Sequence, residues 1–202
     1  MSKKNIIVVG LWLSVLWLQA CTENKKSSAL DEETQEQLLK KGSEIAGKAQ
    51  QVLLSNVSEA IKREGVPRAV AFCNLNAAQL TDSMGKNLDI SSITRLSDKN
   101  RNQKNALHKD LDQKAWEIIQ TKMQDANTKE KNTILQDKNQ VYYYQAIAIG
   151  MPTCLSCHGS KESEITIETQ KILNEKYPQD KAFGYKMGDL RGMWKINLST
   201  NG

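Results

Sequence analysis

Apolar residues recur at helical spacing through most of the first half of the chain. Leu38, Ile45, Val52, Val57 and Ile61 lie about one or two helical turns apart, which predicts one long amphipathic helix from Asp31 to about Glu64, closed by Gly65. Pro67 is typical of the first turn of a helix, because its missing N–H would have no partner there. It predicts a second helix that runs to about Met84.

The second half of the chain alternates between strand and helix patterns. β-Branched and alternating residues predict four strands, at 88–96, 133–137, 140–149 and 190–198. Helical spacing predicts helices at 111–126 and 166–177. Alternation in the last strand places Leu190, Trp194, Ile196 and Leu198 on one face and Arg191, Met193, Lys195 and Asn197 on the other. Helices followed by a mostly antiparallel sheet define the α+β class.

The extreme N-terminus has the pattern of an export signal. Lys3 and Lys4 precede the apolar stretch 6–20, which is too short for a membrane-spanning helix of about 20 residues. The stretch ends in LQAC, which resembles the lipobox of bacterial lipoproteins. We therefore predict a lipoprotein signal peptide at 1–20, with lipid on Cys21 as the membrane anchor. An ordinary signal peptide is the alternative. Both predict an exported protein of the cell envelope or periplasm.

The rest of the chain divides into two parts. Residues 21–29 read as a short polar tether, and 30–202 have the length of one domain. The formal net charge is +5, and removal of the two lysines in the signal leaves +3. This charge is too small and too dispersed for a nucleic-acid-binding protein.

The segment CLSCH carries the most specific chemistry in the chain. Cys154, Cys157 and His158 match the attachment motif of c-type haem, C-x-x-C-H. Two thiols at this spacing can add to the two vinyl groups of a porphyrin, and the adjacent imidazole can bind the iron. Attachment of haem c takes place outside the cytoplasm, in agreement with the export signal. The motif predicts one covalent haem.

Two other sites compete with haem. Cys73 could complete a Cys₃His zinc site with the motif, although neighbouring Cys157 and His158 rarely reach one tetrahedral metal together. A thioredoxin-like redox pair would need a βαβ context, which the predicted order of elements lacks. Haem is the preferred interpretation.

The ligand opposite His158 is not determined by the motif. The candidates are Cys73, His108, Met151, Met187 and Met193. His108 lies in a polar loop. Met151 is three residues before Cys154, so it is on the same side of the haem as the motif. Met187 and Met193 lie near aromatic residues, where methionine usually packs in the core. Cys73 lies on the inward face of the second predicted helix. It is either a small buried hydrophobe or an iron thiolate, and periodicity alone leaves the two readings level.

The chain resembles the family of PAS-like mono-haem c domains, long filed as a domain of unknown function. Five segments carry the resemblance: AFCN at 71–74, R-x-S at 95–97, KNRN-x-x-N at 99–105, CLSCH at 154–158 and AFGY-x-x-GD-x-RG at 182–192. It covers roughly 30–198. Gln103 and Ala106 stand where the family usually has proline.

The resemblance implies a PAS-like antiparallel sheet with flanking helices, after a long N-terminal amphipathic helix. It also implies His158 as proximal ligand and Cys73 as the opposite ligand. Arg95, Arg101 and Arg191 are then candidates for contacts to the haem propionates, because guanidinium matches carboxylate in a bidentate way. Each could equally be a structural arginine.

These predictions favour an exported, lipid-anchored cytochrome with His/Cys ligation, acting in redox sensing or low-potential electron transfer. Thiolate donates strongly to Fe(III) and holds the potential low. The alternative is a sensor of diatomic gases that acts through a partner protein, with Cys73 displaced from the iron. We expect no enzyme, because two protein ligands block the iron and no acid–base pair is evident in the sequence.

Overall fold

The long helical stretch at the start of the chain is α1, Glu32–Asn87. This computed structural model describes residues 30–87 and 90–199, with the backbone alone over 74–87. Gly65 has φ +78° and ψ 169°, a left-handed φ that favours glycine and interrupts the helix. Pro67 follows in the first turn of the second part. The predicted break is confirmed, although the second part continues a few residues beyond Met84.

Residues 31–202 form one compact unit. Its described residues contain four strands: β1 (Ser92–Leu96), β2 (Asn132–Asp137), β3 (Gln140–Ala148) and β4 (Leu190–Asn197). They form one sheet in the order β1-β4-β3-β2, and every neighbouring pair is antiparallel. The predicted α+β class is confirmed. The signal peptide, Cys21 and the tether, predicted at 1–29, lie outside the described residues.

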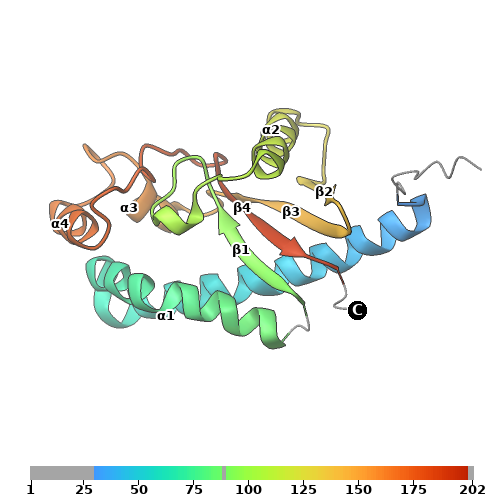
Figure 1. Cartoon of the computed structure of the whole chain (residues 1–202). Helices are drawn as coiled ribbons and strands as arrows, with labels where there is room; N and C mark the ends of the chain where they lie inside the picture. The colour runs from blue at the N-terminus through green and yellow to red at the C-terminus, as the bar shows by residue number, and fades with distance from the viewer. Residues whose placement is uncertain (1–29, 88–89, 200–202) are drawn as a thin grey trace, which may run out of the picture. The chain divides into compact units, whose positions relative to one another are not determined.

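Helices cover both faces of the sheet (Figure 1), with α1 on one face and α2, Asp110–Gln124, on the other. On the α1 side, Ile45, Ala46 and Ala49 pack against Ile93, Tyr143, Trp194 and Ile196 of the sheet and against Leu198, which follows β4. On the α2 side, Ala115, Trp116 and Ile119 pack against Leu96, Tyr142, Tyr144 and Met193. Both faces are therefore hydrophobic, and the alternation along β4 separates two cores rather than a core from solvent.

A register shift in the β3–β4 pair changes the predicted faces of β4. Ile147 pairs with Gly192, but Ala148 pairs with Leu190, so Arg191 is an extra residue in β4. Such a bulge reverses the side-chain alternation beyond it. Leu190 consequently packs with Met193 on the α2 side, and Arg191 lines a cavity on the α1 side. The predicted faces of these two residues were wrong for this reason.

The α2 helix carries one buried charge. Asp112 Oδ1 accepts hydrogen bonds from the Tyr144 hydroxyl at 2.8 Å and from Lys195 Nζ at 2.6 Å. The hydrophobic face of α2 consists of Leu111, Ala115, Ile119 and Met123, as predicted. Because a buried carboxylate needs partners, Asp112 fixes α2 against β3 and β4 at one register.

Two short helices lie between β3 and β4: α3, Pro152–His158, and α4, Ile167–Lys176. The α4 helix packs beside the second part of α1, where Val70 meets Ile165 and Leu173. The 3₁₀ turn η1 (Gln103–Asn105) follows β1. In the part of the chain with described structure, no helix is long and apolar enough to span a membrane.

Two glycines of α1 provide a matched test of its packing. A Cβ on Gly42 would overlap the ring of buried Tyr143, whereas a Cβ on exposed Gly47 would meet nothing within 4 Å. We expect Gly42→Ala to lower the free energy of unfolding by about 1–3 kcal/mol through overpacking. Gly47→Ala should raise it by about 0.5–1 kcal/mol, because alanine favours the helix. Urea denaturation of both variants checks this. Equal stabilisation by both would contradict the close contact between α1 and β3.

Candidate functional site

A cavity of about 460 Å³ lies between α1, the ends of β1 and β4, and α3. Seven residues singled out by the sequence all line it: Cys73, Arg95, Arg101, Cys154, Cys157, His158 and Arg191. They come from α1, β1, the loop after β1, α3 and β4. Another wall is apolar and is supplied by α1 through residues such as Leu53, Val57 and Ile61. Mostly apolar walls with a few converging polar groups are typical of a ligand or cofactor site.

The α3 helix carries the CLSCH motif. It begins at Pro152, which is favoured in the first turn, and Met151 is its N-cap residue. Cys154 and Cys157 are three positions apart, so they lie on one face of α3. Arg101 Nη2 donates to the Cys157 carbonyl at 2.5 Å, at the C-terminal end of the helix. The fold thus presents two thiols and the His158 imidazole to the same cavity.

His158 is held by a backbone carbonyl. Its Nδ1 lies 2.8 Å from the Ala182 oxygen, so Nδ1–H donates there and Nε2 keeps the lone pair. Arg191 Nε lies 3.2 Å from Nδ1 and 3.4 Å from Nε2. Because Nδ1 is already a donor, we assign the Arg191 hydrogen bond to Nε2. A metal on His158 would replace this bond.

Burial governs the protonation of the site. It lowers the pKa of His158 well below its usual value, and the charges of Arg191 and Arg101 lower it further. Burial also raises the pKa of Cys157 and of Cys73, while Arg101 opposes both shifts and Arg95 opposes the second. A neutral imidazole is the form that binds metals. The described cysteines, 73, 154 and 157, are not in disulfides.

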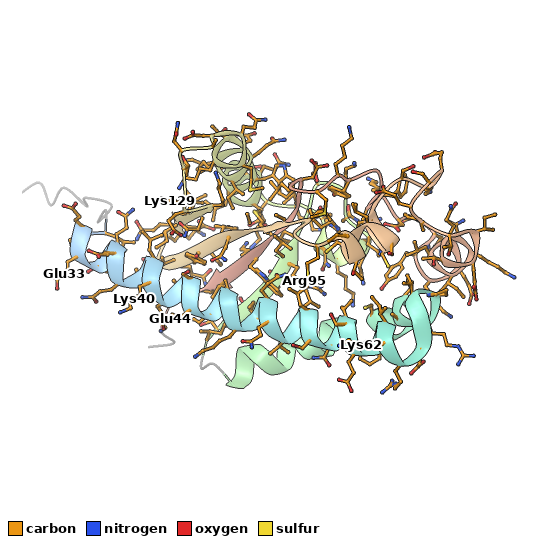
Figure 2. The ribbon with its side chains drawn as sticks, turned by 180° about the vertical axis from the view of Figure 1, so that it is seen from behind. Glu33, Lys40, Glu44, Lys62, Arg95 and Lys129 are labelled. Carbon is orange, nitrogen blue, oxygen red and sulfur yellow. The ribbon has the colours of Figure 1, made fainter. Side chains whose placement is uncertain are left out.

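The three arginines differ in their partners. Arg101 forms a buried ion pair with Asp180 at 3.0 Å. Arg95 and Arg191 form no ion pair with a carboxylate whose position is described. Burial lowers the pKa of Arg95, and it lowers that of Arg191 to about 10. Figure 2 shows Arg95 on the side of β1 that faces α1. Two partly buried guanidiniums without a described carboxylate partner favour an anionic ligand.

Of the five candidates for the ligand opposite His158, the cavity is lined by Cys73 and Met151. His108 is exposed and lies beside the Gln103 carbonyl, and Met187 is 48% exposed. Met193 is fully buried on the α2 side of the sheet. Met151 belongs to the same turn as the motif, whereas Cys73 reaches the cavity from a different element. Cys73 is therefore the cavity-lining candidate that lies outside the motif helix.

The donor groups do not gather as a zinc site would. In the described ranges, no three His, Cys, Asp or Glu side chains approach closely enough to hold a metal ion together. These donors line one cavity, but they are not grouped around a single metal position: Cys73, Cys154, Cys157 and His158. Two free thiols on one helix, an imidazole whose Nε2 carries a lone pair, apolar walls and two guanidiniums without a described carboxylate partner fit a covalently attached haem.

Several residues around the site were not assigned a role from the sequence. Ser97 Oγ donates to the Arg191 carbonyl at 2.9 Å and accepts from Arg191 Nη1 at 3.2 Å. Tyr185 packs edge-on to His158 with ring centroids 6.2 Å apart. Ser97 and Tyr185 lie in segments that the resemblance singled out, but no sequence signal marked Asp180. Its role depends on a contact with a residue 79 positions away.

Fold and site together define a PAS-like α+β domain with a C-x-x-C-H helix at the wall of an arginine-lined cavity. Family comparison agrees with this class. The family model described as Tll0287-like matches residues 29–199, so the chain belongs to the Tll0287-like family.

One solved structure is similar over nearly its whole length, the crystal structure of the cyanobacterial haem protein Tll0287. The identity is 23% and the TM-score 0.58, with 85% of this chain and 97% of that chain covered. This likeness confirms the predicted PAS-like fold. No curated protein matches the chain.

Proposed function

We propose that the chain is a mono-haem c-type cytochrome, with haem attached through Cys154 and Cys157. His158 and Cys73 would be the two axial ligands. The observation that carries the proposal is that these four side chains, from α3 and from the second part of α1, line one cavity. The similarity to a haem protein of the same fold supports it. When bound, haem iron supplies one-electron chemistry.

The arginines would hold the propionates. Arg95 and Arg191 are the better candidates, because neither forms an ion pair with a described carboxylate. Guanidinium can bind a carboxylate through two parallel hydrogen bonds. Arg101 already uses Nε on Asp180 and Nη2 on backbone carbonyls, which leaves one terminal nitrogen for a ligand.

In function the protein would carry electrons at low potential or respond to the redox state outside the cytoplasm. A thiolate ligand stabilises Fe(III), which lowers the reduction potential. Cys73 and His158 would occupy both axial positions, which argues against an enzyme acting on a small substrate at the iron. Export and an anchor at Cys21 belong to the same proposal and rest on the lipobox-like sequence LQAC.

One feature favours sensing of a diatomic gas as the second candidate. The kink at Gly65 separates the helix segment that bears Cys73 from the segment that packs under the sheet. If a gas displaced Cys73 from the iron, this segment would be the part of α1 that moves, with Gly65 as the hinge. A partner protein would then have to read the movement.

The haem content of the purified chain tests the proposal. We expect a haem-stained band on a denaturing gel and a pyridine haemochrome spectrum of the c type, with one haem per chain. Slow carbon monoxide binding to the reduced form would favour electron transfer, and rapid binding would favour sensing. Zinc in place of iron, or haem that is extracted by acid and organic solvent, would refute covalent haem c.

A further inference from the structure

Two segments distant in the sequence join beside the C-terminal end of α3. Lys99 Nζ donates to the Phe183 carbonyl at 3.1 Å, and the Lys181 N–H donates to the Asn100 carbonyl at 3.2 Å. Gln103 extends the same junction to the backbone of residue 179. Residues 99–103 and 179–183 therefore form one brace against the motif helix.

Arg101 is the centre of this brace. Its Nε donates to Asp180 Oδ2 at 3.0 Å, and its Nη2 donates to the carbonyls of Cys157 at 2.5 Å and Ala182 at 3.3 Å. The side chains of Arg101 and Asp180 are only 14% and 7% exposed. Asp180 Oδ1 also accepts the Ala182 N–H at 2.8 Å. One guanidinium thus binds the end of α3 and the loop that faces it.

The Ala182 carbonyl that Arg101 contacts is the same carbonyl that accepts the His158 Nδ1–H at 2.8 Å. The loop is further joined to α3 by the Tyr185 N–H, which donates to the His158 carbonyl at 3.0 Å. A histidine ligand is normally oriented through its second ring nitrogen, and the group that accepts that N–H fixes the tautomer and the ring plane. Movement of Ala182 would therefore turn the imidazole.

We propose that Arg101 is a positioning residue for His158. Through its hydrogen bonds to the Cys157 and Ala182 carbonyls, Arg101 sets the tautomer and ring plane of the imidazole. Asp180 holds the Arg101 guanidinium in place. This inference rests on the proposed haem function for its consequence at the iron. It differs from a propionate contact, because the three hydrogen bonds of Arg101 go to protein groups around His158.

Three variants separate geometry from charge. Arg101→Lys keeps the positive charge but cannot make three hydrogen bonds in a fixed plane. Arg101→Gln removes the charge, and Asp180→Ala removes the anchor while Arg101 stays. Arg63→Gln, an exposed arginine on α1, is the control for loss of one positive charge. Thermal unfolding of each variant shows whether the fold persists.

We expect the ferric wild type to give one low-spin electron paramagnetic resonance signal. Arg101→Lys, Arg101→Gln and Asp180→Ala should each give a broadened signal or a second one, because the ring plane is no longer unique. Arg63→Gln should match the wild type. If Arg101 acts by charge alone, Arg101→Lys keeps the wild-type signal. In that case Arg101→Gln and Asp180→Ala would shift the reduction potential in opposite directions, because one removes a positive charge and the other a negative charge. A wild-type signal in Arg101→Lys together with these opposite shifts would overturn the proposal.

A second measurement does not depend on haem. In full-length chain produced without haem maturation, long-range ¹H–¹⁵N correlations report the tautomer of His158. We expect the Nδ1–H form in the wild type and a mixture in Arg101→Lys and Asp180→Ala. The same single tautomer in all three would overturn the proposal. The two proposals can also fail separately. If the wild type carries no covalent haem but the variants still show the change in tautomer, only the proposed function is refuted.

Discussion

Replacement of both Cys154 and Cys157 by alanine is expected to abolish covalent attachment of haem to the chain. Both thiols lie on one face of α3 and line the cavity beside His158. Without them no thioether bond to the porphyrin can form, so the haem stain on a denaturing gel should be lost completely. Each single variant should keep one thioether, with a shifted pyridine haemochrome band.

Cys73→Ala is the matched control for this loss. Its side chain lines the same cavity but lies outside the motif, so covalent haem should remain at the wild-type level. Mass spectrometry of the denatured chain measures attachment directly. Retention of covalent haem by the double variant would contradict the assignment of both cysteines.

The same Cys73→Ala variant is expected to lose the low-spin thiolate signature of the ferric protein. Cys73 reaches the cavity from α1, and Arg95 and Arg101 oppose the rise that burial causes in its pKa. Iron would complete the stabilisation of the thiolate. Without this ligand the reduction potential should rise, because the donor that favours Fe(III) is lost. Optical and electron paramagnetic resonance spectra of the purified ferric protein measure the change in ligand.

His108→Ala and Met193→Leu are suitable controls for the ligand assignment. His108 is exposed and Met193 is buried on the other side of the sheet, so neither should alter the ferric spectrum. An unchanged ferric spectrum in Cys73→Ala would overturn the assignment of Cys73. Met151, at the N-cap of α3, would then be the next residue to substitute.

Much of the fold was predictable because it follows from local rules. The kink at Gly65 follows from the conformational freedom of glycine and the preference of Pro67 for a first helical turn. The apolar face of α2 follows from its helical period. Alternation along β4 was correct from Met193 onward but failed at Leu190 and Arg191. The bulge there depends on pairing with Ala148, a residue more than forty positions earlier.

The sequence by itself identified the thiols and imidazole of CLSCH as candidates, because the haem attachment proposed for them depends only on their spacing within two helical turns. It also singled out Cys73 and the three arginines as candidates. Only the tertiary structure decided that they line one cavity, that Arg191 faces His158, and that Arg101 is bound to Asp180. These relations arise from chain crossings and a bulge that join distant segments, and no local pattern encodes such distances.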